Sequence, residues 1–170
     1  SDGTLSDEVF GRYIAQDEIY LKNYYHQMNM LASLMDSQED KDLFLAFARS
    51  GMEGEKAMHE MLIDKYGIDV KVESSKVTSD YNAHICEGIA TANQCIALAA
   101  VLPCMWIYNM VGLHILRAAR LENNPYKEWI LEYGNEEFTE GVNTVLKMVD
   151  KLASYADEQT RAAMDYYYLK

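Results

Sequence analysis

The segment LAAVLPCMWIYNMVG, residues 98–112, places a thiol inside an apolar stretch. Cys104 directly follows Pro103, which has no backbone N–H and whose ring crowds the carbonyl group of Ala99 in a helix. We therefore expect a kink at this point. A cysteine thiolate is a strong nucleophile, whereas a neutral thiol is one of the most commonly buried groups. Cys104 is therefore either a core residue or a nucleophile on the floor of a pocket.

A second group of chemically useful residues follows a helical spacing near the start of the chain. Tyr13, Asp17, Tyr20 and Tyr24 stand at i, i+4, i+7 and i+11, which places them on one face of a helix. Such a face suits a flat, nitrogen-bearing ring, because the tyrosines stack and the carboxylate accepts hydrogen bonds from ring substituents. The alternative is a half-exposed face whose tyrosine hydroxyls reach solvent.

Glu55 and His59 form a third candidate pair, at i and i+4 on one helix face. This spacing occurs in helical di-iron proteins, which need further carboxylates and histidines on other helices. The remaining candidates are scattered and do not repeat the motif; they are Asp17, His26, His84, Glu87 and His114. We therefore predict no metal and interpret the pair as a surface or supporting contact.

The composition restricts the partners. The chain has 170 residues and a formal net charge of −12, which disfavours nucleic acid and anionic membranes as partners. The longest apolar window, residues 95–105, is too short for a membrane span. Cys86, Cys95 and Cys104 are nine residues apart, so successive side chains point to opposite sides of a helix. We expect reduced thiols and a cytoplasmic protein.

Hydrophobic periodicity predicts helices throughout, and therefore a single all-α domain over residues 1–170. The first begins after an N-cap at Ser6 and has a core stripe that includes Val9 and Phe10; the second ends at Gly67. Pro125 is predicted at the first position of a short helix. The expected helices cover residues 7–35, 40–66, 78–90, 93–122, 125–133, 136–153 and 157–170.

Four segments in this order resemble the TenA (thiaminase II) family. They are DGTLSDEVFGRYIAQDEIYL, the pair Tyr81 and His84, LPCMWIY followed by Gly112, and NPYKEWILEYGNEEF. The resemblance implies a haem-oxygenase-like multi-helix bundle without a cofactor. It also implies a catalytic glutamate in a C-terminal segment beyond Lys170 and a helix before residue 1, so parts of the terminal helices are expected to be missing from this sequence. Homotetramers are common in this family.

The resemblance also implies an activity, the hydrolysis of aminomethyl pyrimidine breakdown products of thiamine, and of thiamine itself, in thiamine salvage. Cys104 then matches the nucleophile and Asp17 the aspartate that binds the aminopyrimidine edge. Tyr20, Tyr81 and Tyr133 match tyrosines that line the pocket. Tyr24 and Tyr108, one helical turn from Tyr20 and Cys104, are weaker candidates for substrate binding.

Two other functions remain open from the sequence. A pyrimidine-binding or regulatory protein would keep the pocket without catalysis, because the expected C-terminal glutamate lies outside these residues. A haem-oxygenase-like di-iron oxidase would instead use Glu55 and His59.

Overall fold

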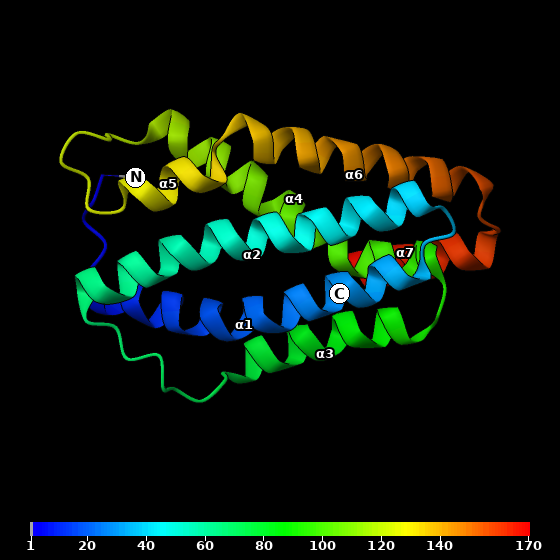
Figure 1. Ribbon diagram of the computed structural model, residues 1–170, viewed down its shortest axis with the longest axis horizontal. Helices are drawn as coiled ribbons and strands as arrows, with labels where there is room; N and C mark the ends of the chain where they lie inside the picture. Colours follow the sequence, from blue (N-terminus) through cyan, green and yellow to red (C-terminus); the bar gives the residue numbers. More distant parts are fainter. Residues whose placement is uncertain (1) are drawn as a thin grey trace.

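The computed structural model describes residues 2–170, apart from the side chain of Ser50 and the burial of Gly51. The described residues form seven α-helices and no strand, so the predicted all-α class is confirmed (Figure 1). The helices are α1 (Asp7–Leu34), α2 (Gln38–Tyr66), α3 (Lys76–Ala90), α4 (Gln94–Ala118), α5 (Lys127–Tyr133), α6 (Glu136–Tyr155) and α7 (Glu158–Leu169).

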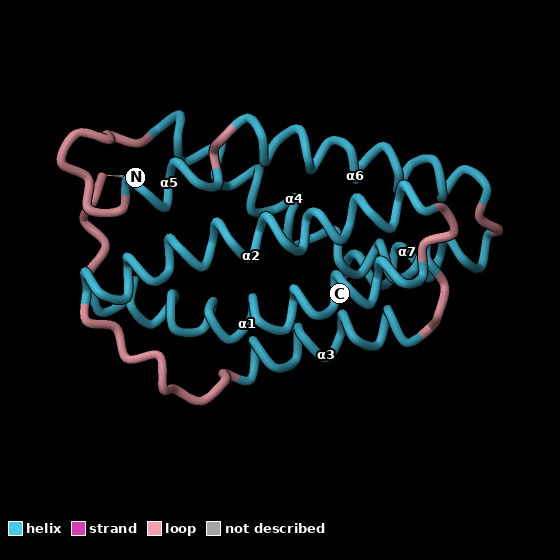
Figure 2. Tube along the Cα trace, in the orientation of Figure 1, coloured by secondary structure: helices cyan, strands magenta, loops and turns pink. Residues whose placement is uncertain are grey.

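The apolar helix α4 is the centre of the bundle. It packs against α1, α3, α5, α6 and α7, while α1 also packs against α2 and α3. The long helices α1, α2 and α6 run along the long axis of the molecule in Figure 1, and most of the connecting loops lie toward its two ends in Figure 2. The most apolar part of α4 passes a length and hydropathy test for a membrane span, but more than half of it is buried inside the bundle. A core helix has the same properties, so α4 is explained by the fold.

The capping residues at the ends of α1 and α2 follow the predicted pattern. The Ser6 hydroxyl accepts a hydrogen bond from the Val9 amide at the start of α1, and Gly67 ends α2 with a φ of 60°. Val9 was predicted in the core stripe, which is wrong, because its side chain is 51% exposed. Its neighbour Phe10 carries the burial instead.

Two predicted helix starts are wrong because tertiary contacts hold the preceding turns. α3 begins at Lys76, not near residue 78, because Ser75 is its N-cap and its amide donates to Gln16 Oε1 of α1 at 2.8 Å. Pro125 is not the first residue of α5, which begins at Lys127. The carbonyl oxygen of Pro125 instead accepts hydrogen bonds from α2, from Lys65 Nζ at 2.9 Å and from the Tyr66 hydroxyl at 2.8 Å.

The predicted end of the central helix near residue 122 is also wrong. α4 runs through Pro103 without interruption but ends at Ala118, and Ala119 has an extended backbone with a ψ of 141°. Ala119 and Leu121 then pack against buried residues of α1, α2 and α5. Burying these side chains favours leaving the helix early.

Two clusters of buried side chains make up the core. The larger one joins α1 to α2, α3, α4 and α6 and includes Tyr20, Tyr24 and Met105. The smaller one joins α1, α2 and α5 and includes Phe10 and Tyr133. Cys104 packs against the larger cluster, and Tyr108 against the smaller one. The side chains predicted to do chemistry therefore lie along the seam between the two clusters.

Candidate active site

Five of the seven predicted site residues line one cavity of about 370 Å³. α1 contributes Tyr20 and Tyr24, α4 contributes Cys104 and Tyr108, and α5 contributes Tyr133. Aromatic contacts line the wall: the Tyr20 and Tyr24 rings stack at 5.5 Å, and the Tyr108 and Tyr133 rings lie 5.0 Å apart in a tilted arrangement. The cavity therefore presents a thiol among aromatic faces, an arrangement that suits a flat ring of modest size.

The other two predicted residues, Asp17 and Tyr81, line a second hollow of about 330 Å³. Tyr20 and Tyr108 belong to the walls of both spaces and so separate Asp17 from the cavity that contains Cys104. The Tyr81 ring stacks on the Tyr20 ring at 5.5 Å and 9°. The structure thus brings all seven residues to one region but divides them between two adjoining spaces.

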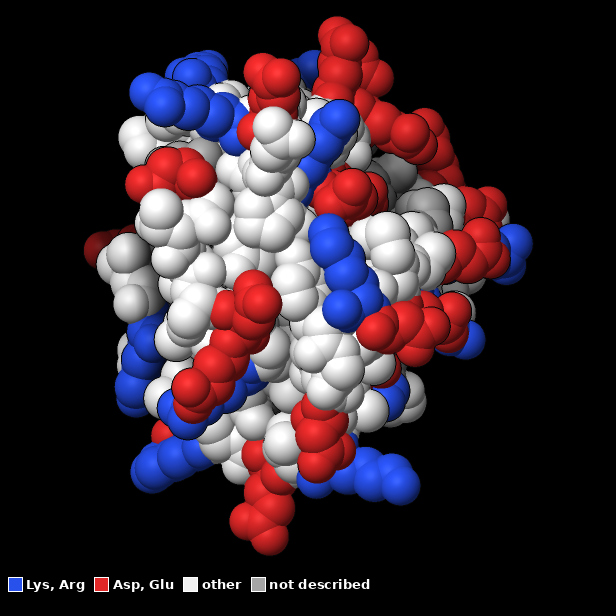
Figure 3. Space-filling model, turned by 90° about the vertical axis from the view of Figure 1, so that its left-hand side faces the viewer, with Lys and Arg blue, Asp and Glu red and all other residues white. Residues whose placement is uncertain are grey.

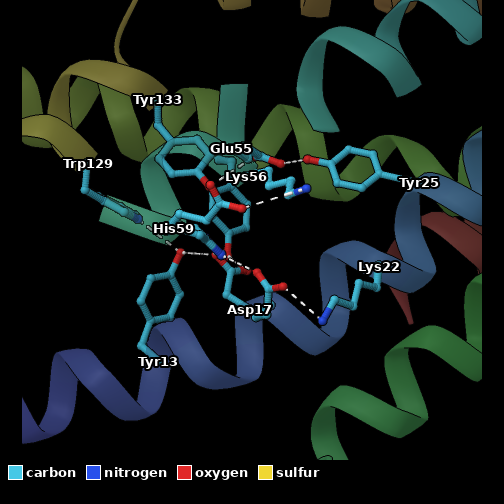
Figure 4. A network of polar contacts seen from close by, with 12 residues as sticks. Tyr13, Asp17, Lys22, Tyr25, Glu55, Lys56, His59, Trp129 and Tyr133 are labelled. Atoms are coloured by element: carbon cyan, nitrogen blue, oxygen red, sulfur yellow. Dashed lines mark hydrogen bonds and ion pairs between the residues drawn. The ribbon is translucent and has the colours of Figure 1, made fainter. Parts of the chain in front are cut away.

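Asp17 is buried in a network of polar contacts, shown in Figure 4. Its Oδ2 accepts a hydrogen bond from the Tyr13 hydroxyl at 3.0 Å, and its Oδ1 accepts one from the Tyr108 hydroxyl at 3.4 Å. Trp129 Nε1 donates to the Tyr13 hydroxyl at 3.2 Å. The spacing of Tyr13 and Asp17 on α1 indicated their shared face, but only the fold supplies Trp129 from α5.

His59 packs against Asp17 with only 1% of its surface exposed, so of the two interpretations, a surface or a supporting contact, the supporting contact holds for this residue. Its Nδ1 lies 3.0 Å from Glu18 Oε2, and its Nε2 lies 3.4 Å from Asp17 Oδ2. Burial lowers the pKa of His59, but the contacts with the two carboxylates outweigh burial and raise it above its ordinary value. His59 therefore links Asp17 to Glu18 across the α1–α2 interface.

Glu55 is the residue of this site whose place the sequence did not indicate. It is partly buried on α2, it lines the cavity with Cys104, and it accepts hydrogen bonds from the hydroxyls of Tyr25 and Tyr133, the latter at 3.0 Å (Figure 4). Burial, together with the negative charge of Asp17, raises the pKa of Glu55 to about 8. The available signal was its position one turn before His59, a pair that was interpreted as a surface or supporting contact rather than as part of a pocket.

The cavity holds Cys104 in its neutral form. Burial raises the pKa of its thiol to about 12; the hydroxyls of Tyr20 and Tyr24 oppose that rise, and the charge of Glu55 adds to it. Tyr24 also donates a hydrogen bond to the carbonyl oxygen of Val101 at 3.2 Å. Cys86, which is exposed, and Cys95 are free thiols that line neither space.

Gly112 fixes the approach of α5 to α4. A Cβ atom at this position would stand 2.2 Å from the carbonyl oxygen of Tyr133, which is closer than any real contact. Glycine therefore lets the two backbones touch and brings the Tyr133 ring into the cavity wall.

The charged groups around the site do not form a basic surface or a metal cluster in the part of the chain that is described. The end of the bundle shown in Figure 3 carries acidic and basic side chains interspersed around uncharged ones. No group of three or more His, Cys, Asp or Glu side chains is placed to hold a metal ion among the described residues. Glu55 and His59 instead have protein partners.

The fold and the site define an all-α bundle with a cysteine facing an aromatic cavity, and the comparisons with known proteins give this class a family. The TENA/THI-4/PQQC family matches residues 1–170, so the chain belongs to that family. A TenA homologue from Pyrococcus furiosus has the same fold, with a TM-score of 0.91 at 18% identity over 98% of this chain and 80% of that one.

Two curated relatives carry functional names. The chain is 28% identical to the aminopyrimidine aminohydrolase of Bacillus subtilis over 96% of its own length and 70% of the relative. It is 32% identical to the thiamine biosynthesis multifunctional protein ThiED of Corynebacterium efficiens, of which it spans 23%.

Proposed function

We propose that this protein is an aminopyrimidine aminohydrolase of the thiaminase II type, which uses Cys104 as its nucleophile in thiamine salvage. The observation that carries the proposal is the position of Cys104 in a tyrosine-lined cavity, within a chain of the TENA/THI-4/PQQC family. Relatives named aminopyrimidine aminohydrolase indicate a hydrolase, and the ThiED relatives support a place in thiamine metabolism.

The reaction replaces the amine of an aminomethyl pyrimidine by the hydroxyl of water. In the proposed mechanism the Cys104 sulfur adds to the pyrimidine ring while the thiol proton moves to a ring nitrogen. Electrons from the ring's amino group then expel the amine, which takes up a proton and leaves as ammonia, so that an exocyclic methylene group remains. Water adds to this methylene and releases a proton that replaces the one taken up by the amine. The sulfur departs, and the ring proton returns to the thiol. Covalent catalysis in this way divides one difficult displacement into easier steps.

The tyrosines and Asp17 have binding roles in the proposal. Tyr20, Tyr24, Tyr108 and Tyr133 enclose the ring in the cavity, while Tyr81 supports Tyr20 from the adjoining hollow. Asp17 reaches the ring's nitrogen edge once Tyr108, which donates to its Oδ1, turns toward the substrate. Because a carboxyl group next to a ring nitrogen stabilises its protonated form, Asp17 also makes the ring a better acceptor for sulfur.

The test is Cys104→Ser, with ammonia release from 4-amino-5-aminomethyl-2-methylpyrimidine as the measurement. We expect turnover to fall at least a hundredfold, since a serine hydroxyl is a far weaker nucleophile without an adjacent base. Unchanged ammonia release would reject the cysteine mechanism. Cys86→Ser is the matched control, because Cys86 is exposed and lines neither space.

One observation favours a second candidate, a protein that binds the pyrimidine without turning it over. The pKa of the Cys104 thiol is raised to about 12, so the free protein holds almost no thiolate at neutral pH. Calorimetry with the aminomethyl pyrimidine, combined with the ammonia assay, separates the candidates: binding with no turnover by the wild-type protein selects the second.

The assembly and location are further parts of the proposal. We propose that residues 1–170 act as one domain and that the protein is a cytoplasmic homotetramer. Exposed apolar side chains on α4, namely Ile107, Met110 and Val111, are the kind of surface that a second copy covers. Light scattering on the purified protein tests the homotetramer, and a monomer at micromolar concentration would refute it.

A further inference from the structure

We propose that His59 is a positioning residue for substrate binding, whose imidazolium holds one oxygen of Asp17 in place and leaves the other oxygen to accept hydrogen bonds from a protonated aminopyrimidine. This inference rests on the proposed function and adds a residue to it. Neither the sequence pattern nor the names of the relatives give His59 a part in binding the substrate.

The first support is the place of His59 between two carboxylates, which Figure 4 shows from close by. His59 comes from α2, whereas Asp17 and Glu18 are neighbours on α1. The Nδ1 atom of the ring lies 3.0 Å from Glu18 Oε2, and the Nε2 atom lies 3.4 Å from Asp17 Oδ2. Each ring nitrogen therefore faces a group that, when ionised, can only accept hydrogen bonds, so both nitrogens must carry a hydrogen. The ring is then an imidazolium with its positive charge between the two carboxylates.

The charges around the ring agree with this form. Burial alone would lower the pKa of His59, yet the contacts with Asp17 and Glu18 raise it above its ordinary value. Glu55, one turn earlier on α2, adds little charge at neutral pH, because burial and the charge of Asp17 raise its pKa to about 8. Lys22 pairs with Glu18 at 3.0 Å, but its side chain is 73% exposed and solvent screens its charge. The imidazolium and the two carboxylates together keep a negative charge in excess, which a cationic ring can neutralise.

The second support is the unequal way in which the two oxygens of Asp17 are held. Oδ2 accepts a hydrogen bond from the Tyr13 hydroxyl at 3.0 Å and faces His59. The Tyr13 hydroxyl is itself fixed, because it accepts a hydrogen bond from Trp129 Nε1 at 3.2 Å. Oδ1 has a weaker partner, since the Tyr108 hydroxyl is 3.4 Å away and also lies 3.3 Å from the Tyr13 hydroxyl. Oδ1 is therefore the oxygen that a ligand in the adjoining hollow can take, because Asp17 lines that hollow.

The third support is the contact between His59 Nε2 and Asp17. Nε2 is buried and forms no hydrogen bond with any described residue, although Asp17 Oδ2 is only 3.4 Å away. A buried donor without a partner is costly. A small movement of the Asp17 carboxylate toward Nε2 removes that cost, and hydrogen bonds at catalytic sites commonly tighten in this way when a substrate binds. We expect the contact to shorten when a pyrimidine binds to Oδ1.

A double-mutant cycle tests whether His59 acts through Asp17. The probe is 4-amino-5-hydroxymethyl-2-methylpyrimidine, the product of the proposed reaction, because it binds without being turned over. The measurement is its dissociation constant by calorimetry at pH 7. His59→Gln keeps an amide donor but carries no positive charge, and we expect it to raise the dissociation constant about tenfold. In an Asp17→Asn background the same substitution should change the constant by less than about twofold.

His26→Gln is the matched control, because His26 is exposed on α1 and lines neither space. Its dissociation constant should stay within about twofold of wild type. A similar rise for His59→Gln in both backgrounds would mean that His59 only supports the packing of α1 on α2, and would overturn the inference. No rise in either background would overturn it as well.

If His59→Gln does not fold by circular dichroism, Glu18→Gln takes its place in the cycle. This substitution removes the carboxylate that faces Nδ1, and its side chain is 23% exposed, so the fold tolerates it better. It should raise the dissociation constant about threefold with Asp17 present and leave it unchanged in the Asp17→Asn background. Equal effects in the two backgrounds would again overturn the inference.

NMR of the imidazole nitrogens gives a readout that packing alone would not move. At pH 6 both ring nitrogens of His59 should carry hydrogens, because the pKa is raised above its ordinary value. Asp17→Asn should shift the titration midpoint of this ring to lower pH, since one of the two carboxylates is gone. A midpoint that stays in place would show that the ring does not feel the charge of Asp17, and would overturn the inference.

Failure of the proposed function is seen separately. A wild-type protein that does not bind the pyrimidine at millimolar concentration rejects the proposed function, and the role of His59 falls with it. If the wild-type protein binds the pyrimidine but Cys104→Ser still releases ammonia at the wild-type rate, the cysteine mechanism is rejected. The binding cycle then still decides the role of His59.

Discussion

Glu55→Gln should stabilise the folded protein, and the gain should grow with pH. The pKa of Glu55 is raised from its usual 4.5 to about 8 by burial and by the charge of Asp17. A carboxyl group whose pKa is higher in the folded protein favours folding while it is protonated. That contribution is complete below about pH 4.5 and is lost as the pH rises to about 8. Glutamine carries no charge and escapes this loss.

The size of the effect follows from the two pKa values. Each pH unit between them is worth about 1.4 kcal/mol, and the interval is about 3.5 units, so the full effect is about 5 kcal/mol. We expect Glu55→Gln to raise the free energy of unfolding by about 1 kcal/mol at pH 5.5, by about 4 kcal/mol at pH 8 and by about 5 kcal/mol at pH 9.

Urea unfolding followed by circular dichroism, at several pH values between 5 and 9, measures this difference. Glu60→Gln is the control, and its effect should stay within about 0.5 kcal/mol at every pH because the side chain is exposed. A gain at Glu55 that does not change with pH would show that its carboxyl group is not held neutral by burial. A wild-type protein more stable than the variant at pH 9 would refute the sign of the argument.

Two further predictions concern the walls of the cavity. Gly112→Ala should lower the free energy of unfolding by about 3 kcal/mol, because the new Cβ atom would clash with the carbonyl group of Tyr133. Urea unfolding measures this loss. Gly11→Ala is the control and should cost nothing, because a Cβ atom there meets only ordinary contacts. Iodoacetamide at pH 8 should alkylate Cys104 at least about a hundredfold more slowly than the exposed Cys86, because the pKa of the Cys104 thiol is about 12. Peptide mass spectrometry measures both alkylation rates. Equal rates would contradict a neutral Cys104 thiol.

The amino-acid sequence by itself determined the helical class and most helix ends. Local signals carry this information, because a cap such as Ser6 or Gly67 acts through hydrogen bonds and backbone angles within one turn. The shared face of Tyr13, Asp17 and Tyr20 also follows from the helical repeat alone. The early end of α4 does not, because packing of Ala119 and Leu121 against other helices decides it.

Only the tertiary structure decided how the chemically active residues are grouped. Spacing along a helix cannot show that Tyr20 and Tyr108 stand between Asp17 and Cys104, because α1 and α4 meet through packing of residues far apart in sequence. The same limit applies to Glu55, whose neighbours Tyr25 and Tyr133 come from two other helices. Burial among those helices raises the pKa of Glu55, and no local pattern encodes it.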